Sequence, residues 1–431
     1  MSQGEKIRIA FIIDVFPALS QTFILNQITG LIDRGHEVDI FAAQAENLDT
    51  VHADINKYEL LERMHNKEPI PKNILWRILK GLYLACIILR KNPKALLISL
   101  DNFKHGRKAM ALHLLYRILP LIGCEPYDII HAHFGPNGLL AAKLREIGAI
   151  QGKLVTTFHG YDVNLLPKRY GIDYYTPLFE NCDLYTVNTD FTAEIAISLG
   201  CSRNKMVKLP VGLKVINYAF EQKKRNAGAQ VRILTVARLV EKKGIEFSIR
   251  AVASLIAKHP GIIYNIVGEG PLRLKLEVLI EKLGVSKSVR LVGPCRQEEV
   301  IRWYSHSQIF ILSSVTSSDG DQEGQGLVLQ EAQAKGLPVI STFHNGIPEG
   351  ILNGVSGFLV PERDVDALVE KLKYLIEHPD IWLKMGQAGR AFVEKRYDSE
   401  KLNDRLVEIY RGLLNDGLRE NMQFENNDRL C

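Results

Sequence analysis

The densest group of chemically useful residues lies between Glu323 and Glu331, in the sequence Glu-Gly-Gln-Gly-Leu-Val-Leu-Gln-Glu. Two glycines precede an apolar run that predicts a helix, and the free N–H groups of a helix's first turn can bind phosphate oxygens. Carboxylates repel phosphate, so Glu323 and Glu331 fit better as acceptors for hydroxyl groups on either side of it, those of a sugar and a ribose. The alternative is a capped surface helix with an exposed glutamate.

A pair of cations follows the strand predicted at residues 231–236. Arg238 offers a planar fork and Lys243 a point charge, which together suit a diphosphate; the alternative is a solvated basic turn. Gly268 and Gly270, after the strand predicted at 262–267, would let the backbone approach a ligand closely. Arg273 replaces the third glycine of a dinucleotide fingerprint, which argues against an NAD-dependent enzyme.

Histidines end two neighbouring strands of the first half. A neutral imidazole beside an anionic cleft can hydrogen-bond a substrate or hold a proton. We expect His131 to face the core and His159 to serve a site, whereas His133 suits either place. No third ligand stands at metal spacing, and the polar loop with Asp319 and Asp321 fits a mobile flap better than a metal site, so no metal is expected.

The elements that must position these residues alternate strand and helix in both halves of the chain. Short apolar, β-branched runs predict strands at 7–13, 37–41, 128–132, 154–158, 184–187, 231–236, 262–267, 289–292, 309–312 and 338–341. Helices are predicted between them, among others at 21–34, 137–147, 191–198 and 244–258. This alternation predicts the α/β class, with two doubly wound parallel-sheet domains facing each other across a cleft.

The same alternation divides the chain. We expect an N-terminal domain over 1–213, a linker over 214–230 and a C-terminal domain over 231–395. A helix over 396–420 would return toward the N-terminal domain, and a disordered tail would follow over 421–431.

Composition excludes several classes of protein. Of 431 residues, 46% are hydrophobic and 24% charged, which excludes wholesale disorder. The net charge of +5 is too small to indicate nucleic-acid binding. Six cysteines without zinc or redox spacing are typical of reduced thiols, and neither a secretory signal nor a spanning segment is expected, which favours a cytoplasmic protein.

A basic stretch interrupts the first half between residues 72 and 117, where ten Lys or Arg accompany one acid, Asp101. Beside these basic residues, five apolar residues recur at helical spacing, namely Trp76, Leu79, Leu82, Tyr83 and Cys86. Such a helix can lie on an anionic membrane, each basic residue contributing about 1 kcal/mol, which would make the protein peripheral on the membrane's inner face. In the alternative, the apolar face packs on the sheet and the basic face is solvated.

Together these motifs resemble the family-4 retaining glycosyltransferases of the GT-B fold, which has two Rossmann-like domains. The resemblance covers nearly the whole chain and rests on 323–331, Arg238 with Lys243, 267–272 and 157–162. Four further segments are similar to the branch that builds exopolysaccharides of the colanic acid type: 16–23, 34–38, 336–341 and 346–349.

The resemblance implies a transferase without cofactor, in which the C-terminal half binds a UDP- or GDP-linked sugar and the N-terminal half a saccharide or lipid-linked saccharide. Arg238 and Lys243 would hold the diphosphate, Glu323 the sugar and Glu331 the ribose, with His159 at the reaction centre. Further donor-side residues are implied: Gly268, Gly270, Arg296 (near the base), Gly324, Gly326, Leu327 and Val328. The implied acceptor-side residues are Phe16, Ser20, Gln21, His133 and Asp162.

Two features qualify the resemblance. Many relatives carry a glycine pair in the first loop, where this chain has Phe16-Pro17. A nucleotide-sugar 2-epimerase shares the fold, and a non-catalytic nucleotide-sugar-binding protein is the other alternative, although the complete set of charged residues argues against it.

Overall fold

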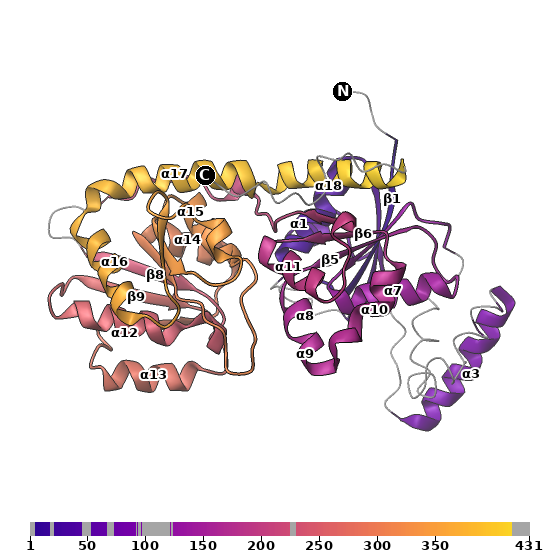
Figure 1. The fold of residues 1–431 in the computed structure, drawn as a ribbon, viewed down its shortest axis with the longest axis horizontal. Coiled ribbons are helices and arrows are strands. Elements are labelled where there is room, and N and C mark those ends of the chain that lie inside the picture. Colours follow the sequence, from indigo (N-terminus) through magenta and orange to yellow (C-terminus); the bar gives the residue numbers. More distant parts are fainter. Residues whose placement is uncertain are drawn as a thin grey trace.

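A computed structural model describes residues 5–17, 21–44, 53–66, 73–91, 93, 96, 121, 124–224 and 230–415. Two parallel sheets organise these residues, one in each half of the chain (Figure 1). Most strand residues are fully buried, as expected where helices cover both faces of a parallel sheet. The predicted fold class is therefore confirmed.

The N-terminal sheet has seven strands in the order β3-β2-β1-β4-β5-β6-β7. Their bounds are Arg8–Val15 (β1), Glu37–Gln44 (β2), Met64–Asn66 (β3), Ile129–His133 (β4), Lys153–Phe158 (β5), Leu184–Val187 (β6) and Met206–Lys208 (β7). The helices of this half are Thr22–Asp33 (α1), Ala53–Lys57 (α2), Ile74–Lys91 (α3), Gly135–Glu146 (α7), Tyr161–Asn164 (α8), Leu166–Tyr170 (α9), Thr176–Asn181 (α10) and Asp190–Ser198 (α11). Helix α7 begins two residues before its predicted start because Pro136 fits the first turn, where its missing N–H costs nothing.

The C-terminal sheet has six strands in the order β10-β9-β8-β11-β12-β13. They span Val231–Val236 (β8), Ile262–Val267 (β9), Val289–Gly293 (β10), Ile309–Leu312 (β11), Val339–Thr342 (β12) and Gly357–Val360 (β13). Its helices are Ile245–Ile256 (α12), Arg273–Lys282 (α13), Gln297–His306 (α14), Leu327–Ala334 (α15) and Val365–Glu377 (α16). Because β8 pairs with β9 on one side and β11 on the other, the strand order reverses there, and in doubly wound sheets ligands bind beyond the strand ends at such a reversal.

Two final helices, Trp382–Arg396 (α17) and Ser399–Leu414 (α18), run along one edge of both halves (Figure 1). Helix α17 packs on α15, whereas α18 packs on α1 of the N-terminal half. Leu406, Ile409 and Tyr410 of α18 belong to the same buried cluster as strand β1. The last described helix thus forms part of the hydrophobic core of the N-terminal half.

Helix α3 projects away from the sheets (Figure 1). Leu84 and Ile88 are buried, but most of its large apolar side chains are exposed. The alternative in which the predicted apolar face packs on the sheet is therefore wrong, since its five residues are exposed: Trp76, Leu79, Leu82, Tyr83 and Cys86. No helix in the described ranges combines the length and apolar content that a membrane crossing requires.

Tyr410 links α18 to the N-terminal sheet, and its hydroxyl lies 2.5 Å from Nδ1 of the buried His131. We expect Tyr410→Phe to destabilise this half by about 1–3 kcal/mol, because it leaves a buried ring nitrogen without a partner. Thermal unfolding measures the loss. Tyr374→Phe, at a half-exposed ring of α16, is the control; equal unfolding midpoints for the two variants would contradict a stabilising role for the Tyr410 hydroxyl.

Candidate active site

The predicted site residues come from loops at the carboxyl ends of parallel strands. Arg238 and Lys243 follow β8, Glu323 follows β11, and His159 follows β5 of the other sheet. A close contact between the halves brings the last two together: a Cβ added to Gly324 would lie 2.6 Å from the carbonyl oxygen of His159. The site therefore lies where the two halves meet.

An ion pair forms the centre of the C-terminal side. Nζ of Lys243 lies 2.5 Å from Oε2 of Glu323, and both side chains are mostly buried. Burial alone would raise the pKa of Glu323, but Lys243 and Lys242 hold it below the ordinary value, so the carboxylate stays ionised at neutral pH. Lys242 pairs with Asp321 at 3.0 Å, whereas Arg238 is exposed.

The loop that carries Glu323 is fixed by residues that the sequence did not single out. The backbone N–H of Glu323 donates to Nε2 of His344 at 3.0 Å, and Nδ1 of His344 lies 2.5 Å from Glu362. Because Nε2 accepts, the geometry assigns the ring proton to Nδ1, where it is donated to Glu362. His344 follows strand β12, so a search of every strand end could have found it.

Glu331 lies about one turn into α15, and it is not in an open cleft. Its two carboxylate oxygens accept hydrogen bonds of 2.8 Å from the hydroxyls of Tyr218 and Tyr304. Burial raises the pKa of Glu331, although these hydrogen bonds lower it in part. Gln297 donates to the Tyr218 hydroxyl at 2.6 Å, which extends the network to the start of α14.

The glycines after β9 have a packing role. A Cβ at Gly268 would lie 1.9 Å from the carbonyl oxygen of Ala237, and one at Gly270 would lie 2.6 Å from that of Leu239. Because glycine has no side chain, these two residues let their loop pack closely against the turn that carries Arg238. This role differs from the one expected from the sequence, which is the close approach of a ligand to the backbone. Arg296 is exposed at the start of α14.

The start of α15 follows the expected pattern. Gly326 adopts a left-handed conformation with φ 74° immediately before the helix, and Leu327 and Val328 form its half-buried first turn. Left-handed backbone favours glycine, so Gly326 permits the sharp turn by which the Glu323 loop enters α15.

On the N-terminal side, His159 rests on a buried histidine. Its Nε2 lies 3.0 Å from Nδ1 of His133, and the ring of Phe134 packs against it with centroids 4.4 Å apart. Burial lowers the pKa of His159 to about 3, so the ring is neutral at physiological pH. His131 lies in the core as predicted, bonded to Tyr410 and Thr157.

Three of the residues expected to face the acceptor are buried instead: His133, Asp162 and Phe16. Asp162 accepts hydrogen bonds from the backbone N–H groups of Gly135, His159 and Gly160, and burial, which these bonds oppose, raises its pKa to about 6. Phe16 is 3% exposed and packs in the core. Asp162 therefore positions the His159 loop from within the core, and Phe16 packs in the buried cluster of strand β1.

The other expected residues are placed as follows. Gln21 is half-buried immediately before α1, and Ser20 lies outside the described residues. The loop expected to be a mobile flap is tied by Ser318 to Glu241 and by Asp321 to Lys242. Across the described ranges, no cluster of three or more His, Cys, Asp or Glu is arranged to hold a metal ion.

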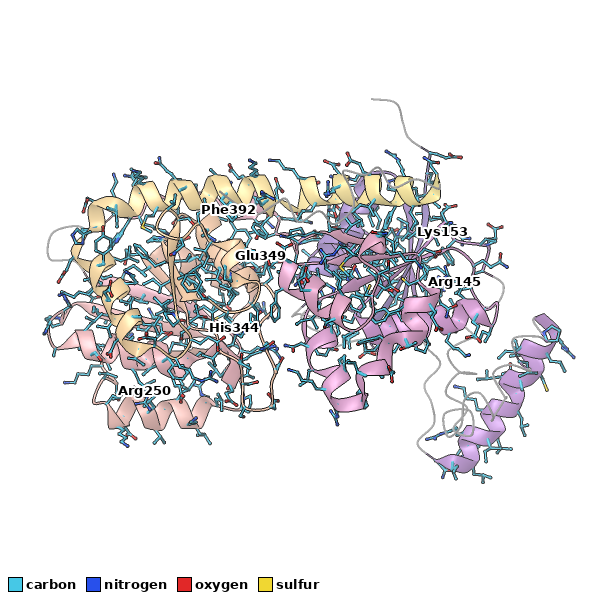
Figure 2. All side chains as sticks on the ribbon, in the orientation of Figure 1. Arg145, Lys153, Arg250, His344, Glu349 and Phe392 are labelled. Atoms are coloured by element: carbon cyan, nitrogen blue, oxygen red, sulfur yellow. The ribbon has the colours of Figure 1, made fainter. Side chains whose placement is uncertain are left out.

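Further contacts hold the halves together around the site. The side chain of Gln325 exchanges hydrogen bonds of 2.8 and 2.9 Å with the backbone of Val211. Glu349, at the boundary of the halves in Figure 2, accepts from the N–H of Asp190 at 2.9 Å and pairs with Lys208 at 2.7 Å. The described conformation is therefore closed over the site.

Comparisons with known proteins agree with this geometry. Residues 20–215 match the model for Glycosyltransferase Family 4, and residues 218–392 match that for Glycosyl transferases group 1. AmsK of Erwinia amylovora, an amylovoran biosynthesis glycosyltransferase, is 36% identical over 94% of this chain and 100% of its own. WcaL of Salmonella typhimurium, named for colanic acid biosynthesis, is 35% identical over 94% of this chain and 99% of its own. The chain belongs to glycosyltransferase family 4.

Solved structures confirm the GT-B fold. HepE of Anabaena, in complex with UDP, aligns with a TM-score of 0.67 at 16% identity, covering 94% of this chain and all of its own. Sucrose-phosphate synthase of Thermosynechococcus elongatus aligns with a TM-score of 0.69 at 19% identity, covering 96% of this chain and all of its own. The prediction of a retaining glycosyltransferase is confirmed by the family, and the epimerase and non-catalytic alternatives are set aside.

The Lys243–Glu323 ion pair leads to a prediction about how the C-terminal side binds a nucleotide. We expect Glu323→Gln to bind a nucleoside diphosphate without sugar about three- to tenfold more tightly, because Lys243 is freed and a repelling charge is removed. Titration calorimetry with UDP and GDP measures this. Glu269→Gln, which removes an exposed carboxylate paired with Arg273, is the control; weaker binding by the Glu323 variant would contradict the arrangement.

Proposed function

We propose that this glycosyltransferase moves a sugar from a UDP- or GDP-linked donor to a saccharide or lipid-linked saccharide acceptor in exopolysaccharide biosynthesis. The names of AmsK and WcaL support the biosynthetic role. The bound UDP of HepE and the GDP-mannose dependence named for a Mycobacterium tuberculosis relative (27% identical over 66% of this chain and 77% of its own) support a nucleotide-sugar donor. The observation that carries the proposal is the Lys243–Glu323 pair, held on a loop whose next residue, Gly324, contacts the backbone of His159 in the other half.

On the donor side, the proposed roles follow from charge. When the sugar departs, negative charge grows on the diphosphate, and prearranged cations and helix N–H groups stabilise it best. Arg238, Lys243 and the start of α15 at Gly326 would supply these groups, with Gly324 alongside, while Glu323, released by Lys243, would accept hydroxyls of the sugar. Glu331 would accept ribose hydroxyls, since each oxygen keeps a second lone pair beside its tyrosine.

On the acceptor side, we assign His159 to the reaction centre as a neutral group. A ring with a pKa near 3 can donate or accept one hydrogen bond but supplies no positive charge at neutral pH. This supports a mechanism in which the leaving phosphate takes the proton of the acceptor hydroxyl. His133 would act through His159, by holding its ring in place.

The proposed division of labour follows the two sheets. Residues 1–213 would bind the acceptor and 231–395 the donor, with 214–230 as the linker and 396–420 returning to the first domain. Tyr218 and Lys223 of that linker are buried against the C-terminal half, so the linker also supports the donor side. A lipid-linked acceptor would place the enzyme on the inner face of the membrane.

The experiment that tests the proposal is a transfer assay with a panel of UDP- and GDP-linked sugars, preceded by thermal-shift screening, since bound donor raises apparent stability. We expect one donor class to stabilise the protein and to be consumed only when a saccharide acceptor is present, at a rate that a metal chelator leaves unchanged. Stabilisation by none of the donors, or a strict divalent-metal requirement, would contradict the proposal.

We expect Arg238→Ala and Lys243→Ala each to lower turnover ten- to a thousandfold, equivalent to about 1.4–4 kcal/mol of transition-state stabilisation. The reason is the loss of a cation beside the departing diphosphate. Arg250→Ala removes an exposed cation of α12 and is the matched control. Turnover within threefold of the wild type in both site variants would refute the assigned roles.

A further inference from the structure

Helix α3 carries an unusual density of exposed apolar side chains. Eight of its large hydrophobic residues are between 47% and 71% exposed: Ile74, Leu75, Trp76, Ile78, Leu79, Leu82, Tyr83 and Leu89. Contiguous apolar patches are rare on the surfaces of soluble proteins and mark sites of contact with another molecule or a membrane. This surface of α3 is called the apolar face below.

The apolar face has helical geometry. Leu75, Leu79, Leu82 and Leu89 stand three, four or seven residues apart, so they line one side of the helix. The opposite side holds Leu84 and Ile88, which are buried in the cluster that contains strand β4. The helix is therefore anchored by one narrow stripe, and its broad apolar face points away from the protein.

The charges of α3 indicate what kind of molecule the apolar face contacts. The helix contains four basic residues and no acid: Arg77, Lys80, Arg90 and Lys91. A second copy of the same helix would bring like charges together, whereas anionic lipid headgroups would attract them. Trp76 and Tyr83, both 66% exposed, are amphipathic rings of the kind that settle at the boundary between headgroups and acyl chains.

We propose that the apolar face of α3 inserts into the headgroup boundary of an anionic lipid bilayer, with the helix lying in the plane of the membrane. This differs from electrostatic docking of a basic face, the expectation from the sequence, since the side chains that point outward are mostly apolar. Lys80, one of the basic residues of α3, is half-buried. Insertion has an apolar component that salt does not screen, so binding falls only in part as salt rises.

The surface serves the proposed function, since it would hold the acceptor-binding half at the membrane where a lipid-linked acceptor resides. Only this biological role, holding the enzyme near a lipid-linked acceptor, rests on the proposed function. Its geometry does not depend on which sugar is transferred, and the donor side lies in the other half of the chain.

The test uses the full chain and co-sedimentation with vesicles of phosphatidylcholine alone or with 30% phosphatidylglycerol, a composition chosen for the charge contrast. We expect binding to the anionic vesicles, and at least a tenfold loss of binding in the triple variant Leu75→Ser/Leu79→Ser/Leu82→Ser. Leu274→Ser/Val278→Ser, on the exposed side of α13 in the other half, is the matched control and should bind like the wild type. Circular dichroism checks that both variants remain folded.

A second readout reports insertion directly. The tryptophan fluorescence of the wild type should shift to the blue on addition of anionic vesicles. Trp76→Phe should abolish the shift, because Trp382 is buried in the C-terminal core and Trp303 is half-buried on α14 of the same C-terminal half. Binding by the triple variant equal to that of the wild type, or no binding by either, would overturn the proposal. So would a wild-type dimer in sedimentation velocity that the triple variant converts to a monomer.

Failure here is distinguishable from failure of the proposed function. The triple variant should transfer sugar to a soluble acceptor at the wild-type rate, because α3 contributes nothing to the proposed donor or catalytic side. Loss of lipid binding with intact transfer supports the surface. Intact lipid binding in a protein that transfers no sugar would overturn the proposed function alone.

Discussion

The rest of the site depends on one close backbone contact between the two halves. Gly324 of the C-terminal loop lies so near the carbonyl oxygen of His159 that a side chain there would have to displace it. A Cβ on Gly160, the next residue of the His159 loop, would lie 3.3 Å from Cα of the same glycine. This approach puts the loop of Glu323 and Lys243 against the loop of His159. Gln325 and Glu349 fasten the halves beside the contact.

Around this contact, buried charge is balanced in the absence of donor. Lys243 and Lys242 face Glu323 and Asp321, so neither lysine is left as an uncompensated buried charge. An entering diphosphate would take the place of those carboxylates as partner of the cations, while the released carboxylates become acceptors for hydroxyls. The pairing thus offers a physical reason for carboxylates and the cations proposed to bind the diphosphate to share one small site.

Much of the fold follows from the sequence because a buried parallel strand is a local pattern. Strands β6, β8, β9 and β11 begin and end where their apolar, β-branched runs begin and end. The charged residues at strand ends could be found for the same reason, since doubly wound topology brings those ends together. Strands β3 and β7 have only three residues, too few for a periodic signal. Strand β13 is as long as β6 and β11, but it begins with a glycine and contains a single β-branched residue.

The contacts that tune the site are not local and could not be predicted. Tyr218 reaches Glu331 across 113 residues, and Asp162 reaches Gly135 across 27. The periodicity of apolar residues also predicts the two faces of an amphipathic helix, but it does not predict which face is buried by the rest of the chain. Helix α3 shows the difference, since its broad apolar side is the exposed one.

The most direct test of the closed site is the turnover of Gly324→Ala, measured beside its affinity for the nucleoside diphosphate. Cβ atoms essentially never lie within 3.0 Å of another heavy atom, so a methyl group 2.6 Å from the His159 oxygen must push the halves apart. We predict that turnover falls at least tenfold while affinity stays within about threefold, because Arg238 and Lys243 remain in place. Turnover equal to that of the wild type would show that transfer does not require the contact between Gly324 and His159.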